Sequence, residues 1–129
     1  MMIRARALAR RRRGAVLAET AVVYPAFLMT VLAGLSLGMG LYRYQEVAHL
    51  ARESARWASL QDATMRTPAQ ILSNVVRPKA VCVNPSAVTI TTTPSQTDMA
   101  TVTISYAWTP EIYFGTITLH STARARIAY

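Results

Sequence analysis

The longest apolar run in the sequence extends from Ala15 to Tyr42, and Glu19 is its only residue with a formal charge. Coiled into a helix, these 28 residues would rise about 42 Å, which exceeds the ~30 Å hydrocarbon core of a bilayer. A buried core helix is the alternative interpretation, but such helices are usually shorter and keep one polar face. The pattern therefore predicts a helix that crosses a membrane once.

Beyond Tyr42, apolar residues recur at helical spacing on one face and polar residues occupy the other. This spacing predicts that the helix continues without a break to about Leu60. The apolar face holds Tyr44, Val47, Ala48, Ala51, Ala55 and Ala58. The polar face holds Glu46, His49, Arg52, Glu53 and Arg56.

A second, short helix is expected after a link from Gln61 to Arg66. Thr67 is a suitable N-cap, Pro68 suits the first helical position, and Gln70 completes the pattern of a capping box. Pro78 is expected to end this helix, because proline cannot continue the hydrogen-bond ladder. Its apolar face is formed by Ile71, Leu72, Val75 and Val76.

Three later segments alternate between apolar and mostly threonine-rich positions, which is typical of half-buried antiparallel strands. Pro94 to Asp98 predicts a turn between the first two, and Ala80 to Val83 is a candidate fourth strand. The dry face of such a sheet needs a cover, which the outer part of the long helix or the short helix can supply. The inward positions are Val88, Ile90 and Thr92, then Val102, Ile104, Tyr106 and Trp108, then Ile117, Leu119, Ala123, Ala125 and Ile127.

We therefore expect an α+β protein with a long N-terminal transmembrane helix that continues into a small exported domain. That domain would hold one short helix and a three- to four-stranded antiparallel sheet. The expected parts are a basic leader at 1–14, the transmembrane helix at 15–42, its outer extension at 43–60 and the exported domain at 61–129.

The net charge of +8 is concentrated in the leader. Residues 1–13 hold six of the 14 basic residues and no acidic one, so 8 basic and 6 acidic residues remain elsewhere, a net charge of +2. Arginine beside a membrane span marks its cytoplasmic side. We expect a cytoplasmic N-terminus, contact with membrane lipid, and no nucleic-acid partner. The six residues are Arg4, Arg6 and the cluster Arg10, Arg11, Arg12 and Arg13.

Glu19 and Gly14 are the candidate functional residues of the apolar segment. A carboxylate inside such a segment costs a few kcal/mol unless it is paired or near the interface, and no Lys or Arg lies between Ala15 and Tyr42. Gly14 would let a protease approach the backbone closely. Cleavage after it would create an α-amino group at Ala15, and this charge could pair with Glu19 of a neighbouring helix and fix the register between subunits. The alternative is that Glu19 only reaches back to the cytoplasmic interface.

A stripe of small residues marks the candidate packing face of the span. Its members recur every four residues, and this spacing allows a second helix to approach closely. Pro25, on the same segment, can kink the helix. The stripe consists of Ala26, Thr30, Gly34 and Gly38.

Groups typical of catalysis or cofactor binding are scarce, so we expect a protein that is not an enzyme and has no cofactor and no metal site. His49 and Glu53 lie one turn apart, but a solvated helix face explains them better than a metal site.

Cys82 is the only cysteine; we expect a buried small hydrophobic residue, with an intermolecular disulfide as the alternative. His120 is expected on the wet face of the last strand. Trp57, Trp108 and Tyr113 are expected in the core or at an interface rather than in a ligand cage.

The cluster Arg10 to Arg13, followed by Gly14 and by Glu19 five residues later, resembles the class III (prepilin-type) leader of type IV pilin-like proteins. With Pro25, the Tyr42-x-Tyr44 pair and the run from Ala51 to Arg56, the pattern resembles the TadE-like minor pseudopilins of the tight-adherence (Flp) pilus machinery.

The resemblance implies a pilin-like fold in the bacterial inner membrane, and cleavage between Gly14 and Ala15 by a prepilin peptidase. It also implies that the partners are other pilins or pseudopilins and the inner-membrane assembly platform. The alternative is an unprocessed, single-pass anchored module that binds a ligand or acts as a scaffold in the cell envelope.

Overall fold

The computed structural model of the protein describes residues 2–93, 98–110 and 115–127, and gives the backbone alone at residues 2–13 and at Ala15. It contains two compact units, Met1–Leu37 and Gly38–Tyr129, which we describe separately. Most of the expected turn from Pro94 to Asp98, and Tyr113, lie outside the described residues.

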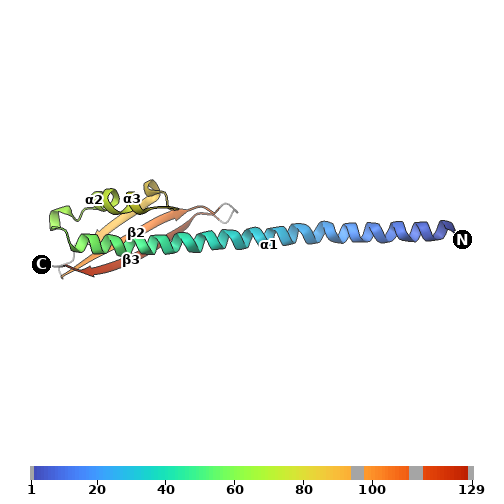
Figure 1. Cartoon of the computed structure of the whole chain (residues 1–129), viewed down its shortest axis with the longest axis horizontal. Helices are drawn as coiled ribbons and strands as arrows, with labels where there is room; N and C mark the ends of the chain where they lie inside the picture. Colours follow the sequence, from blue (N-terminus) through green and yellow to red (C-terminus); the bar gives the residue numbers. More distant parts are fainter. Residues whose placement is uncertain (1, 94–97, 111–114, 128–129) are drawn as a thin grey trace. The chain divides into compact units, whose positions relative to one another are not determined.

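One continuous helix, α1 (Met2–Ser59), contributes residues to both units (Figure 1). The predicted helix from the apolar run to about Leu60 is confirmed, and the helical backbone also extends through the leader. The leader is rich in Arg and Ala, which have high helix propensity. Pro25 lies inside the helix without ending it.

Within the second unit, the predicted apolar face of α1 is largely confirmed, because Val47, Ala51, Ala55 and Ala58 are buried. Tyr44, in contrast, is 46% exposed, and Ala48 is half-buried. Leu50 and Ser54 were not predicted on this face, and both are fully buried. The buried face of α1 is therefore rotated about the helix axis from the predicted face, toward Leu50 and Ser54 and away from Tyr44 and Ala48.

The short helical segment comprises α2 (Pro68–Ile71), a π-helical turn η2 (Leu72–Val76) and α3 (Arg77–Lys79). Thr67 caps it as predicted, because its hydroxyl accepts a hydrogen bond from the Gln70 N–H at 3.4 Å. The Gln70 side chain accepts instead from Asn74 Nδ2 at 3.0 Å. Ile71, Val75 and Val76 are buried, as expected.

The prediction that Pro78 ends this helix is wrong, because helical backbone continues to Lys79. The π-helical turn shifts the hydrogen-bond pattern from i→i−4 to i→i−5 just before the proline. Pro78 then lies in the first turn of α3, where its missing N–H leaves no helical hydrogen bond broken.

The sheet contains three strands, β1 (Val88–Thr93), β2 (Met99–Trp108) and β3 (Ile117–Arg126), in the order β1-β2-β3. Both pairs are antiparallel, with Ile90 opposite Ile104 and Ile104 opposite Ser121. The predicted alternation is confirmed most clearly in β2, where every second residue from Ala100 to Trp108 is buried. At the start of β3 the prediction is wrong for Ile117, which is 41% exposed. Two short 3-10 turns, η1 (Ala63–Met65) and η3 (Pro85–Ala87), complete the connections.

The candidate fourth strand, Ala80 to Val83, is not a strand in the described structure. The Glu46 carboxylate accepts hydrogen bonds from the backbone N–H of Val81 at 2.6 Å and of Cys82 at 3.1 Å. Because these two donors bind a side chain of α1, they are not available to a neighbouring strand. The segment instead bends across α1 and buries Val83, which is 3% exposed.

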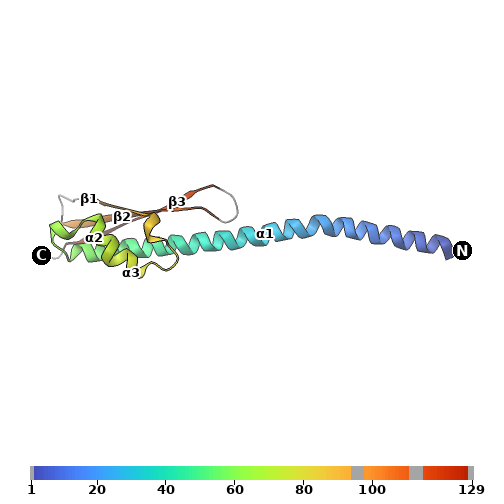
Figure 2. The same ribbon diagram turned by 90° about the horizontal axis from the view of Figure 1, so that it is seen from above.

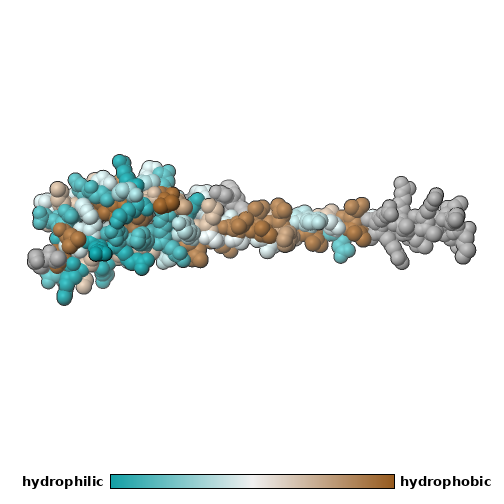
Figure 3. All heavy atoms as spheres, in the orientation of Figure 1, coloured by the Kyte–Doolittle hydropathy of each residue, from teal (hydrophilic) through white to brown (hydrophobic). Residues whose placement is uncertain are grey.

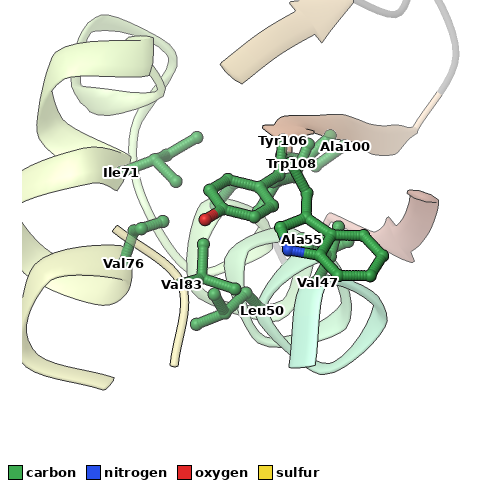
Figure 4. Close-up of a cluster of buried hydrophobic side chains, with 13 residues drawn as sticks. Val47, Leu50, Ala55, Ile71, Val76, Val83, Ala100, Tyr106 and Trp108 are labelled. Carbon is green, nitrogen blue, oxygen red and sulfur yellow. The ribbon is translucent and has the colours of Figure 1, made fainter. Parts of the chain in front are cut away.

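The core of the second unit lies between the sheet and the helices. Figure 2 shows the strands as one layer, with α2, α3 and the outer part of α1 on one side of it. Figure 4 shows Tyr106 between Ile71 and Val76 of the short helical segment and Leu50 of α1. The prediction that these helices cover the dry face is therefore confirmed.

An ion pair joins α1 to α3. The Lys79 ammonium lies 2.5 Å from Glu53 Oε1. By donating this hydrogen bond, and by its charge, Lys79 lowers the pKa of the Glu53 carboxyl below its ordinary value. Both side chains are partly exposed, so solvent screens the pair and its contribution to stability is small.

The lowered pKa of Glu53 gives this pair a defined pH dependence. The stabilisation is present above the ordinary pKa of a glutamate carboxyl, 4.5, and is lost as the pH falls through the lower folded-state pKa. We expect Glu53→Gln to be slightly less stable than the wild type at pH 7 and equally stable at the acid end of this range. Urea unfolding in detergent at several pH values measures this, and a difference that does not shrink with acidification would contradict the assignment.

Gly40 leaves room for an aromatic side chain. A Cβ atom at this position would lie 2.6 Å from Cζ3 and 2.8 Å from Cη2 of Trp108. The Arg43 guanidinium, one turn further along α1, lies 5.3 Å from the centroid of the same indole. Gly40 and Arg43 therefore hold the end of β2 against α1.

We expect Gly40→Ala to lower the free energy of unfolding by about 1–2 kcal/mol, because overpacking costs more than the ~1 kcal/mol of helix propensity gained. Gly38→Ala is the matched control, since a Cβ there meets nothing within 4 Å, and it should be neutral or stabilising. Urea unfolding of the full chain in detergent, followed by tryptophan fluorescence, compares the two. Equal stability of both variants would contradict the steric argument.

Candidate membrane helix and assembly site

The first unit exposes a long apolar surface along α1. Its large apolar side chains, from Val16 to Leu37, are between 41% and 75% exposed. Figure 3 shows brown, hydrophobic residues along this part of the helix. A continuous apolar surface of this extent on a helix marks contact with lipid or with other helices. The helix is long and apolar enough to cross a membrane.

Glu19 is exposed on this apolar segment. Among the side chains that the structure describes, none forms a salt bridge or a hydrogen bond with its carboxylate. The next residue, Thr20, uses its hydroxyl within the helix by donating to the Val16 carbonyl at 2.6 Å. Glu19 is therefore a charge on an apolar surface that is available to a group from another molecule.

Gly14 lies within helical backbone and is exposed. A Cβ atom there would meet nothing within 4 Å, so none of the described side chains requires glycine at this position. The side chains of Arg10 to Arg13 and of Ala15 lie outside the described part. The backbone at Gly14 is thus accessible to another protein.

All four residues of the predicted small-residue stripe are exposed. The Thr30 hydroxyl donates to the Ala26 carbonyl at 2.9 Å, so its hydrogen-bonding group is satisfied within the helix. A Cβ atom at Gly34 or at Gly38 would meet nothing within 4 Å. The stripe therefore makes no packing contact within the described chain, and its role in the approach of a second helix stays a prediction.

The remaining candidates lie in the second unit. His49 is exposed, while Glu53 binds Lys79, and among the described residues no group of three His, Cys, Asp or Glu side chains is placed to hold a metal. His120 is exposed on the outer face of β3, as predicted. Trp57 and Trp108 both belong to the core or pack against it, which confirms their assignment.

The prediction for Cys82 is wrong, because its thiol is exposed rather than buried. The Cys82 backbone N–H donates to the Glu46 carboxylate, which fixes the backbone at this point. In this bend the following residue, Val83, enters the core. The cysteine therefore makes no contribution to the core.

Sequence reasoning missed the contact of Gly40 and Arg43 with Trp108. Gly40 was visible only as one more small residue in an apolar run. Its role depends on which strand residue lies opposite α1, and neither helical nor strand periodicity carries that information. The sequence did offer one indication of this contact: Trp108, a large side chain on the inward face, lies at the end of a strongly alternating strand and needs space on the element that covers it.

Comparison with known proteins gives one family match. Residues 14–56 match the model of a family described as TadE-like protein. This segment covers a third of the chain and includes Gly14, Glu19 and the small-residue stripe. No curated protein and no solved structure matches the chain.

Proposed function

We propose, on the premise that residues 14–56 are TadE-like, that the protein is a minor pseudopilin of a tight-adherence (Flp) pilus system. It is held in the bacterial inner membrane by α1, with its N-terminus in the cytoplasm and its C-terminal domain outside. A prepilin peptidase cleaves it between Gly14 and Ala15. The processed chain then takes part in pilus assembly.

One observation carries this proposal. Glu19 and Gly14, five residues apart, are both exposed on a helix whose apolar surface is also exposed. Cleavage would place a new ammonium group at Ala15. Since Glu19 has no partner among the described side chains, the ammonium group of a neighbouring subunit can pair with it. Such a pair in an apolar environment sets the axial register between helices.

The small-residue stripe supports the same proposal, because it lets the helix of a partner approach along Gly34 and Gly38. The partners are other pilins or pseudopilins and the membrane-embedded assembly platform, with lipid around the unassembled precursor. The role is structural. The protein is not an enzyme, and it needs no cofactor and no nucleic acid.

A second candidate function is an unprocessed anchored binding module. It is favoured by a hollow of about 340 Å³ in the second unit, lined by Arg66, Thr92 and Val102 among others. In that case the leader stays attached and Glu19 has no role.

The decisive experiment is co-expression with a prepilin peptidase, followed by intact-mass analysis of the purified protein. We expect the loss of residues 1–14 from the wild type. Gly14→Val should keep the full leader, whereas Gly34→Val, the same substitution at another exposed glycine, should be processed normally. Retention of the leader in the wild type would reject the processing step and favour the second candidate.

A further inference from the structure

One end of the second unit carries exposed apolar and aromatic side chains, most of them arranged around α1 at one level along its axis. We call this belt the basal surface. It lies where β2 ends and β3 begins, because Trp108 pairs with Ile117 and the indole of Trp108 packs on Gly40 of α1. Its members are Met39 at 46%, Leu41 at 60%, Tyr42 at 56%, Tyr44 at 46% and Ile117 at 41% exposure.

The chemistry of the basal surface is that of a membrane–water interface. Tyr and Trp are enriched there because an apolar ring is joined to a polar group. Arg43 is the first charged residue of α1 after Glu19, and its guanidinium lies over the Trp108 ring. From Glu46 onward the exposed or half-buried positions of α1 include His49, Arg52 and other charged or polar residues, which suit water.

The position of these residues along α1 agrees with that chemistry. Thr20 to Tyr42 spans 23 uncharged residues, which rise about 34 Å as a helix and match the hydrocarbon core of ~30 Å. If Glu19 lies at one boundary, Tyr42 lies at the other. The contact between Gly40 and Trp108 then brings the end of the sheet to the same depth as Tyr42.

We propose that the basal surface lies in the headgroup region of the outer leaflet, and that phospholipid is its partner before assembly. The tyrosines and Ile117 enter the interface, and Arg43, stacked on Trp108, faces the lipid phosphates. The end of the sheet is thereby docked on the membrane rather than held away from it in water. This inference rests on the proposed membrane span and adds a second lipid contact to it.

Two tryptophans at different heights provide the test. Trp57 lies 17 residues beyond Gly40 on α1, about 26 Å further along the helix. Trp57→Phe keeps Trp108 as the only tryptophan, and Trp108→Phe keeps Trp57. The full chain is placed in phosphatidylcholine vesicles whose lipids are brominated either near the headgroup or at the chain end.

We expect Trp108 to lose emission mainly with the shallow bromines, and Trp57 to be unaffected by either. If Trp108→Phe does not fold, the emission of Trp57 is obtained by subtracting the emission of Trp57→Phe from that of the wild type. Leu32→Trp, in the background lacking both native tryptophans, reports on the span itself and should be quenched by the deep bromines.

The outcomes distinguish the docking of the basal surface from the membrane span on which it depends. Quenching at position 32 without quenching of Trp108 would overturn the docking of the basal surface and leave the span intact. Stronger quenching of Trp108 by deep than by shallow bromines would also overturn it. Absence of quenching at position 32 would instead reject the span on which the inference depends.

Discussion

Glu19→Ala is expected to insert into the membrane as well as the wild type but to lose association with partner pseudopilins. In the proposed assembly, this carboxylate pairs with the new ammonium group at Ala15 of a neighbouring subunit. Removing one partner of a desolvated ion pair leaves the other charge uncompensated and costs about 3 kcal/mol or more. That corresponds to a loss of roughly a hundredfold or more in association.

Co-purification of tagged protein with its partners from membranes measures this effect. Thr20→Ala is the matched control, because the Thr20 hydroxyl bonds to its own helix at Val16 and should not matter for association. Glu19→Gln keeps hydrogen-bonding capacity without the charge and should also fail to associate. Normal recovery of partners with either Glu19 variant would remove this residue from the mechanism.

Leu50→Ala is expected to lower the free energy of unfolding of the second unit by about 2–5 kcal/mol. Leu50 is fully buried, and it belongs to the cluster that α1 forms with Ile71, Ile104 and Tyr106. Truncation leaves a cavity between layers that cannot close without moving α1. A small domain has only about 5–15 kcal/mol of stability in total, so the variant loses a large share of it.

The control for this prediction is Leu60→Ala, because Leu60 is 65% exposed just after α1. Its effect should stay within about 0.5 kcal/mol. Urea unfolding of both full-length variants in detergent, followed by circular dichroism, provides the comparison. Similar midpoints for the two would mean that Leu50 does not belong to the cooperative core.

Much of the fold was predictable because its signals are local and periodic. The alternation around Val102 and Ile104 fixes which face of β2 is inward, and the long run before Tyr42 defines one helix. The errors at Cys82 and at the candidate fourth strand arose where a tertiary contact decided the outcome. Glu46 captures two backbone donors and turns the segment at Cys82 away from the sheet, and no spacing in the sequence links positions 35 residues apart.

The candidate assembly site was predictable for a different reason. A single carboxylate in an apolar run stands out in composition, so Glu19 needed no structure to be noticed. The chain alone does not reveal its partner, because the proposed pair forms between molecules. Gly40 shows the converse case: it is an inconspicuous residue by sequence, and its importance is visible only from the position of Trp108.

The bend at Cys82 has a practical consequence for studying assembly in living cells. The chain contains a single sulfhydryl group; it is exposed on the second unit, and the carboxylate of Glu46 anchors its backbone. In the proposed topology, a maleimide dye that does not cross the inner membrane would mark each exported copy once, without any engineered mutation. Counting such marks under the microscope would give the number of subunits in each filament or base.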